Sequence, residues 1–190
     1  DELCVGGGLG VAYVEGESAP TITQWAAAVR DAARGAGLAE GVRILAEPGR
    51  AIVAQAAITV YCVGAVKELA SRTYMAVDGG MSDNPRPVLY GSGYEAFDVA
   101  RPLAERTRRV RLVGKHCESG DVLVDEADLP ASTGVGDLVA TPVTGAYGYS
   151  MASTYNRVPR PAVVFVADGR ARVVLRRETF DDLALLEVDG

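Results

Sequence analysis

The chain has 190 residues, of which 48% are hydrophobic, and a formal net charge of −6. This length can bury a sizeable core, and an acidic balance with scattered arginines argues against a nucleic-acid partner. No apolar run reaches the roughly 20 residues that span a bilayer, and the first residues lack the basic start of a signal peptide. Three well-separated cysteines fit a reducing compartment, and one histidine without a Cys-x-x-Cys pair leaves a zinc site short of ligands. We expect a globular cytoplasmic protein with no membrane partner.

The first part of the chain has the pattern of a strand–helix–strand unit. An apolar run at 3–5 ends in glycines, as a buried strand does where it opens into a loop. Residues 21–34 follow with a helical spacing of apolar side chains, and Gly35 and Gly37 give a stop signal; the apolar positions are Ile22, Trp25, Ala26 and Val29. A second buried strand is predicted at 42–46, so this part reads as a unit of a parallel α/β sheet.

From residue 51 onward, short β-rich runs separated by Gly, Pro and Asp predict an antiparallel β-sandwich or barrel. Asp168-Gly169 is a strong hairpin signal, and 178–186 predicts a short closing helix with Thr179 as a possible cap. We therefore expect a mainly β fold with two parts, residues 1–50 and 51–190. The expected strands are 52–66, 73–77, 109–115, 121–125, 137–142, 162–167 and 170–176.

Two glycine-containing motifs end the predicted strands of the first part. Gly6-Gly7-Gly8-Leu9-Gly10 lets backbone N–H groups approach a phosphate, although a tight turn explains it equally well, and it is not a dinucleotide fingerprint. Glu47-Pro48-Gly49-Arg50 lies at the end of the second strand, where barrel enzymes bind ligands. Taken alone, this run is also compatible with a turn that carries an exposed ion pair.

Three further motifs place reactive side chains in turns. Residues 78–90 are rich in turn formers yet include Arg86 and Tyr90, and residues 145–149 form a phenol-rich turn. Cys117 begins the run Cys-Glu-Ser-Gly-Asp, although a lone cysteine on a strand is commonly a small buried hydrophobe. We reject a catalytic pair with His116, because adjacent residues on a strand point to opposite faces.

Together these motifs resemble the C-terminal half of the diaminopimelate decarboxylases, a branch of the fold-type III pyridoxal-phosphate decarboxylases. The resemblance extends over nearly the whole chain, and Cys-Glu-Ser at residue 117 matches this branch better than the ornithine and arginine branches. It implies that residues 1–50 are the end of a (β/α)8 barrel that binds the cofactor, and that 51–190 are the C-terminal β-domain. It also implies conversion of meso-diaminopimelate to L-lysine and CO2, the last step of lysine biosynthesis.

The resemblance also implies roles for individual residues. Cys117 would reprotonate the substrate carbon after CO2 leaves, since a thiol can donate a proton near neutral pH. A carboxylate at Glu47 would keep the pyridine nitrogen of the cofactor protonated. The implied cofactor residues are Gly6, Gly7, Gly8, Glu47, Gly49, Arg50 and Tyr147. The implied substrate residues are Arg50, Arg86, Tyr90, Glu118 and Tyr147. Cys117 and the cofactor cavity would come from different subunits of a homodimer.

The lysine that binds the cofactor as a Schiff base is the missing part of this pattern. The chain has two lysines, Lys67 and Lys115, and neither matches the position of that residue in the family. We therefore expect a C-terminal region of a longer enzyme, inactive by itself. Two alternatives stay open: an ornithine, arginine or carboxynorspermidine decarboxylase of the same family, and a regulatory binding module without catalysis.

Overall fold

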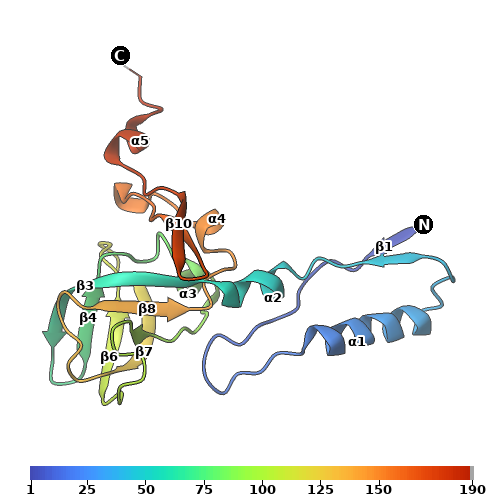
Figure 1. Cartoon of the computed structure of the whole chain (residues 1–190), viewed down its shortest axis with the longest axis horizontal. Helices are drawn as coiled ribbons and strands as arrows, with labels where there is room; N and C mark the ends of the chain where they lie inside the picture. Colours follow the sequence, from blue (N-terminus) through green and yellow to red (C-terminus); the bar gives the residue numbers. More distant parts are fainter. Residues whose placement is uncertain (189–190) are drawn as a thin grey trace.

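The computed structural model describes residues 1–188. It contains strands, α-helices and 3-10 helices in a mainly β arrangement (Figure 1). In chain order they are β1 (Glu2–Cys4), α1 (Ile22–Gly35), β2 (Arg43–Leu45), α2 (Gly49–Val53), η1 (Ala54–Ala56), β3 (Ile58–Glu68), β4 (Thr73–Val77), α3 (Arg86–Tyr90), β5 (Phe97–Asp98), β6 (Arg108–Val113), β7 (Val122–Leu129), β8 (Leu138–Pro142), α4 (Gly148–Met151), η2 (Tyr155–Arg157), β9 (Val163–Ala167), β10 (Arg170–Leu175) and α5 (Phe180–Ala184).

A curled six-stranded sheet forms the body of the protein, with the strand order β5-β8-β3-β4-β6-β7. All its neighbouring pairs are antiparallel except β4 and β6, which run parallel. Side chains at every second position of β4 and β6 are buried, as expected of strands with one face on the core. The largest fully buried ones include Met75, Leu112, Leu123, Leu129, Val63, Val110 and Val139. The expected mainly β fold is therefore confirmed.

Most of the expected elements are present, with two corrections. The strand expected at 52–66 begins only at Ile58, because the alanine-rich run before it continues α2 and forms η1. The strand expected at 121–125 extends to Leu129. The division into residues 1–50 and 51–190 stays a prediction, and α2 runs across that boundary.

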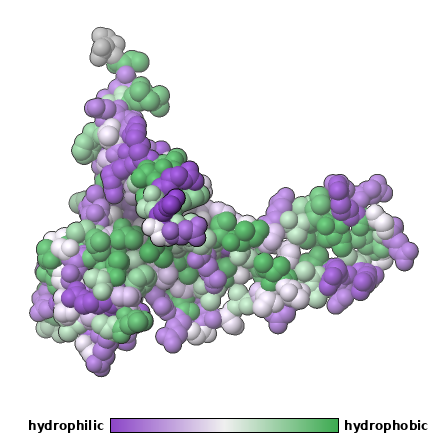
Figure 2. All heavy atoms as spheres, in the orientation of Figure 1, coloured by the Kyte–Doolittle hydropathy of each residue, from purple (hydrophilic) through white to green (hydrophobic). Residues whose placement is uncertain are grey.

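Residues 1–50 form an arm whose β1, α1 and β2 extend away from the sheet (Figure 1), whereas Tyr13 in the loop between β1 and α1 packs into the core. β1 and β2 pair in parallel, and α1 connects them, as the sequence predicts. Thr21 caps α1 in a capping box with Gln24, which satisfies two donors at the start of the helix. No residue of α1 is fully buried, and Leu3, Leu45 and Ile22 are exposed. Figure 2 shows the resulting apolar surface on this arm, which a barrel would bury.

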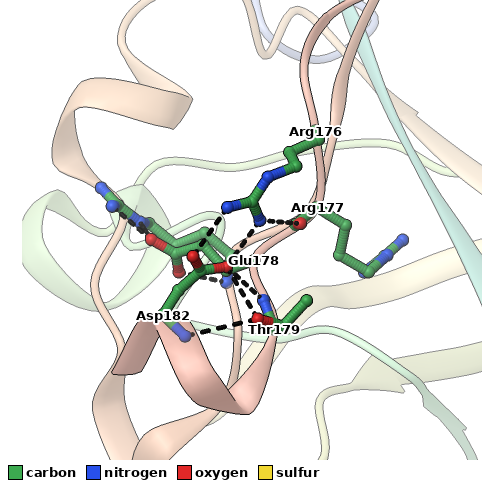
Figure 3. A network of polar contacts seen from close by, with 6 residues as sticks. Arg176, Arg177, Glu178, Thr179 and Asp182 are labelled. Carbon is green, nitrogen blue, oxygen red and sulfur yellow. Dashed lines mark hydrogen bonds and ion pairs between the residues drawn. The ribbon is translucent and has the colours of Figure 1, made fainter. Parts of the chain in front are cut away.

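The last elements form a second projection, held together by ion pairs. β9 and β10 make the hairpin that Asp168-Gly169 predicts, and both turn residues have positive φ angles of 51° and 69°. Thr179 caps α5, which is shorter than expected. Arg176 and Asp182 point toward each other beside this cap in Figure 3, with Nη2 to Oδ1 at 2.7 Å. Arg160 donates from Nε to Glu178 Oε1 at 2.8 Å, which connects the segment before β9 to the segment after β10.

The carboxylate of Asp98 in β5 joins two loops at one edge of the sheet. It accepts hydrogen bonds from Arg101 Nη2 at 2.8 Å and from Thr133 Oγ1 at 2.7 Å. Arg101 also pairs with Asp137 at 2.7 Å. Burial would raise the pKa of Asp98, but the bonds from Arg101 and Thr133 outweigh it and lower the pKa. The charged form of Asp98 therefore stabilises the fold.

Asp98→Asn should lower the free energy of unfolding by about 2–3 kcal/mol, because it removes the charged acceptor of several hydrogen bonds. Asp128→Asn is the matched control: its partner Arg109 lies on the surface, and the loss should be below about 1 kcal/mol. Stability from Asp98 should be complete above the pKa of an unfolded aspartate, about 3.9, and should disappear as pH falls through the lower folded pKa. Urea unfolding of both variants and of the unaltered protein, from about pH 2.5 to about pH 7, measures the free energy of unfolding on both sides of the aspartate pKa. Equal losses in the two variants would contradict it.

Candidate functional site

A cavity of about 790 Å³ lies where the arm meets the sheet. It brings together four of the residues that the sequence analysis selects, Arg50, Arg86, Tyr90 and Tyr147. These four come from α2, α3 and the turn before α4, so distant parts of the chain meet here. The sequence analysis missed several lining residues, among them Tyr13, Glu17, Ser92 and Met151.

The glycine cluster and Glu47 meet through their backbones. The Glu47 N–H donates to the Gly6 carbonyl at 2.7 Å, which continues the pairing of β1 and β2 beyond the strands. A side chain on Gly7 would overlap with the Glu47 carbonyl oxygen, so this approach requires glycine. Gly6 and Gly8 have φ angles of +69° and +91°, which favour glycine as well. The ends of β1 and β2 therefore leave backbone groups accessible beside the exposed Glu47 side chain.

Tyr147 lies directly against the start of α2. An ideal Cβ on Gly49 would lie 2.9 Å from the Tyr147 hydroxyl oxygen, so glycine leaves room for the phenol. The turn that carries Tyr147 is held by the Gly145 N–H, which donates to the Ala54 carbonyl at 3.0 Å. A side chain on Gly145 would overlap with the Val53 carbonyl. These close contacts attach the loop after β8 to the arm and place the Tyr147 hydroxyl next to the Glu47-Pro48-Gly49-Arg50 run.

Arg86 is a buried cation at the other side of the cavity, with 7% of its surface exposed. Its guanidinium lies 5.1 Å from the centre of the Tyr13 ring and 5.1 Å from that of Tyr90. Its Nη2 donates to Ser92 Oγ at 3.4 Å, and Nε has no hydrogen-bond partner within residues 1–188. Burial, and then Tyr13, raise the pKa of neighbouring Tyr94 to about 12, so this phenol stays protonated. A buried arginine without a carboxylate can bind an anionic group.

Cys117 and Glu118 lie outside this cavity, in the exposed turn between β6 and β7. Tyr155 donates its hydroxyl to the Glu118 carboxylate, and this bond raises the pKa of Tyr155. The His116 side chain points inward, where its Nε2 lies 2.9 Å from Ser82 Oγ. This is consistent with rejecting a His116–Cys117 pair, although the residues occupy a turn and not a strand. One chain thus brings Arg50, Arg86, Tyr90 and Tyr147 together in the cavity. The remaining candidates lie outside its lining: Gly6, Gly7, Gly8, Glu47, Gly49, Cys117 and Glu118.

Neither a metal site nor a membrane span emerges from residues 1–188. In this part of the chain, no group of three or more His, Cys, Asp or Glu side chains could hold a metal ion. Every helix described there is too short or too polar to cross a bilayer. Lys67 is exposed in β3 and Lys115 is exposed beside the Cys117 turn, and neither lines the cavity.

Comparison with known proteins shows the family. Residues 21–145 match the C-terminal sheet domain of the pyridoxal-dependent decarboxylases, and the chain belongs to this family. It is 47% identical to the diaminopimelate decarboxylase of Corynebacterium efficiens over 98% of its length, which covers 42% of that protein. It is 45% identical to the Bacillus subtilis enzyme over 98% of the chain and 43% of the relative. The chain thus spans about two fifths of these relatives, and the resemblance inferred from the motifs is confirmed.

Solved structures agree with this assignment. A diaminopimelate decarboxylase from M. jannaschii in complex with L-lysine superposes with a TM-score of 0.89 at 30% identity, over 100% of this chain and 43% of that one. The Helicobacter pylori enzyme with L-lysine gives a TM-score of 0.85 at 34% identity, over 98% and 44%. A lysine/ornithine decarboxylase from Vibrio vulnificus gives 0.70 at 29% identity, over 84% and 42%.

The residues at the arm fit the phosphate of a pyridoxal cofactor. Gly6 and Gly8 have no atom within 4 Å of where a Cβ would stand, so the backbone there is open to a ligand. Gly7 and Gly49 leave no room for a side chain, and the Tyr147 hydroxyl adds a donor beside Gly49. This combination of glycines and a phenol suits a phosphate group.

Gly7→Ala should weaken binding of pyridoxal phosphate to the full-length protein by about tenfold or more, equivalent to about 1.4 kcal/mol. The added methyl group would push against the Glu47 backbone and separate the ends of β1 and β2. Gly10→Ala is the control, because nothing lies within 4 Å of its Cβ position. Titration of the apoprotein followed by absorbance measures both affinities. Equal affinities of Gly7→Ala and Gly10→Ala for the cofactor would contradict phosphate binding at the glycine cluster.

Proposed function

We propose that this chain is the C-terminal region of a diaminopimelate decarboxylase, which converts meso-2,6-diaminopimelate to L-lysine and CO2 in the cytoplasm. The observation that carries this proposal is Arg86, whose buried guanidinium has no carboxylate partner within residues 1–188. The substrate has a second carboxylate remote from the one that is lost, and a buried arginine fork between two phenols suits it. The identity to diaminopimelate decarboxylases supports the same substrate.

In this proposal each group of candidate residues has a separate task. Gly6, Gly7, Gly8, Gly49 and the Arg50 backbone bind the cofactor phosphate together with Tyr147. Glu47 keeps the pyridine nitrogen protonated, and the bound cofactor supplies an electron sink for the bond to CO2. Arg50, Tyr90 and Tyr147 hold the substrate beside Arg86. The covalent lysine comes from outside this chain, since Lys67 and Lys115 do not reach the cavity, and inactivity of the isolated chain stays a prediction.

The thiol step requires a second subunit. Cys117 and Glu118 are exposed and lie away from the cavity of their own chain. We infer a homodimer in which the Cys117 thiol of one subunit donates a proton to the substrate carbon in the other, and Glu118 pairs with the distal ammonium. Exposed reactive groups on a rigid turn suit such an exchange.

The similarity to a lysine/ornithine decarboxylase keeps a basic amino acid with one carboxylate, such as ornithine, as the alternative substrate. Ornithine and arginine have no second carboxylate. Either would leave the buried Arg86 without an anionic partner and would bind less tightly for that reason. Carboxynorspermidine is likewise a weaker match, because the unpaired donors of Arg86 call for a carboxylate at the distal end of the substrate. A regulatory module without catalysis would have no use for the exposed Cys117 turn.

Arg86→Gln in the full-length enzyme should lower kcat/KM for meso-diaminopimelate by about 10–100-fold, the value of one or two lost charged hydrogen bonds. Arg111→Gln is the control, because Arg111 also contacts a tyrosine ring but pairs with Asp125 away from the cavity. Lysine release measured against ornithine and arginine cleavage checks the substrate. Faster cleavage of ornithine by the unaltered enzyme would contradict the proposal.

Mixing two weak variants tests the shared site. Cys117→Ala and Glu47→Gln each disable every site in their own homodimer, but a mixed dimer contains one site with both native residues. Random exchange should restore up to about a quarter of the native activity, because half of the dimers are mixed and each has one intact site. Activity after refolding the mixture measures this. No gain over the separate variants would contradict a thiol donated across the interface.

A further inference from the structure

The buried His116 side chain links the Cys117 turn to two other loops of the same chain. Its Nε2 lies 2.9 Å from Ser82 Oγ, in the loop that leads into α3. Its Nδ1 lies 3.2 Å from Asn156 Oδ1, in the segment that follows Tyr147. Both ring nitrogens are therefore engaged, and they hold opposite sides of the histidine.

Further contacts hold the same turn at both ends. The His116 N–H donates to Asp121 Oδ2 at 2.9 Å, and the Met81 N–H donates to Asp121 Oδ1 at 2.7 Å. The Tyr155 ring packs 5.6 Å from the imidazole, while its hydroxyl bonds Glu118. Residues 116–121 are thus connected to the loop at 79–84 and to the segment at 147–157.

The Cys117 side chain is a free, exposed thiol that makes no hydrogen bond within residues 1–188. Its direction therefore depends on the backbone on either side of it. His116 is the neighbour with a buried, doubly bonded side chain, whereas Glu118, Ser119 and Gly120 are exposed. A shift of about 1 Å in a reacting group can cost about a hundredfold in rate, so the anchor of this turn matters to a proton transfer.

We propose that His116 is a positioning residue that sets the Cys117 thiol for reprotonation and couples it to the loops bearing Arg86 and Tyr147. This inference rests on the proposed function. The same histidine connects the thiol, which serves the partner subunit, to the substrate residues of its own cavity. Its two ring nitrogens contact Ser82, in the loop that leads into α3, and Asn156, in the segment that follows Tyr147.

The test compares His116→Leu, which keeps apolar volume but loses both ring bonds, with His116→Gln, whose amide can replace the bond to Ser82. In the full-length enzyme, His116→Leu should lower kcat by about tenfold or more while KM stays within about twofold. His116→Gln should recover most of that loss. Thr133→Val is the control, since it removes a buried hydrogen bond to Asp98 remote from the turn, and it should leave kcat unchanged.

A second measurement needs no turnover. The rate at which iodoacetamide alkylates Cys117, followed by peptide mass, should change severalfold in His116→Leu and return in His116→Gln. An unchanged alkylation rate would overturn the inference whether or not the protein acts on diaminopimelate. The inference would also be overturned if His116→Leu raised KM as much as it lowered kcat and His116→Gln restored neither, because such a result indicates a structural role alone. If the alkylation rate changes but the native enzyme releases no lysine, the proposed function fails and the anchoring role stands.

Discussion

The close packing between the arm and the loop after β8 is the constraint on which the rest of the structure depends. Gly145 bonds to Ala54 and leaves no room for a side chain beside Val53, and Gly49 leaves room for the Tyr147 phenol. The approach of two backbones at Gly145 requires glycine, and at Gly49 glycine gives space to the Tyr147 hydroxyl. These contacts hold Tyr147 beside Arg50, and both residues line the cavity together with Arg86 of α3.

The candidate site has two chemically different halves, the glycine run on the arm and the cavity that Arg86 lines. The arm provides glycines and open backbone groups, which suit a phosphate, and the sheet side provides a buried guanidinium between phenols, which suits a carboxylate. The Cys117 turn faces away from both halves in the same chain. The candidate binding residues and the Cys117 turn are therefore separate in one chain. The apolar surface on the arm is exposed as well, with Leu3, Ile22 and Leu45 among its residues.

Local signals in the sequence predicted the local structure well. Thr179 caps α5 and Asp168-Gly169 forms the hairpin turn, because each depends on bonds between residues close in sequence. The alanine-rich run before Ile58 was misjudged as strand, since apolar residues without a clear period fit either structure. The parallel pairing of β4 with β6 depends on a long connection, so no local pattern reveals it.

In the candidate site, too, local motifs were recognised from the sequence and long-range contacts were not. Short motifs identified Arg86, Tyr90 and Tyr147, and the fold brings them together with Arg50. Tyr13 was missed because it follows the glycine cluster in a segment without a regular pattern, and its place over Arg86 arises from tertiary packing. His116 was considered only as a partner of Cys117, whereas its contacts with Ser82 and Asn156 come from residues 34 and 40 positions away.

A crystal structure of the full-length protein with pyridoxal phosphate and L-lysine would test the central claim most directly. The account predicts the phosphate between the Gly6–Gly8 backbone and the Tyr147 hydroxyl, Glu47 at the pyridine nitrogen, and the partner subunit's Cys117 at the same cavity. The L-lysine α-carboxylate, which is the carboxylate that the reaction leaves in place, should lie at Arg86, and the side-chain amine should lie at the cofactor. A cofactor bound elsewhere, or a Cys117 turn remote from every cavity of the assembly, would contradict it.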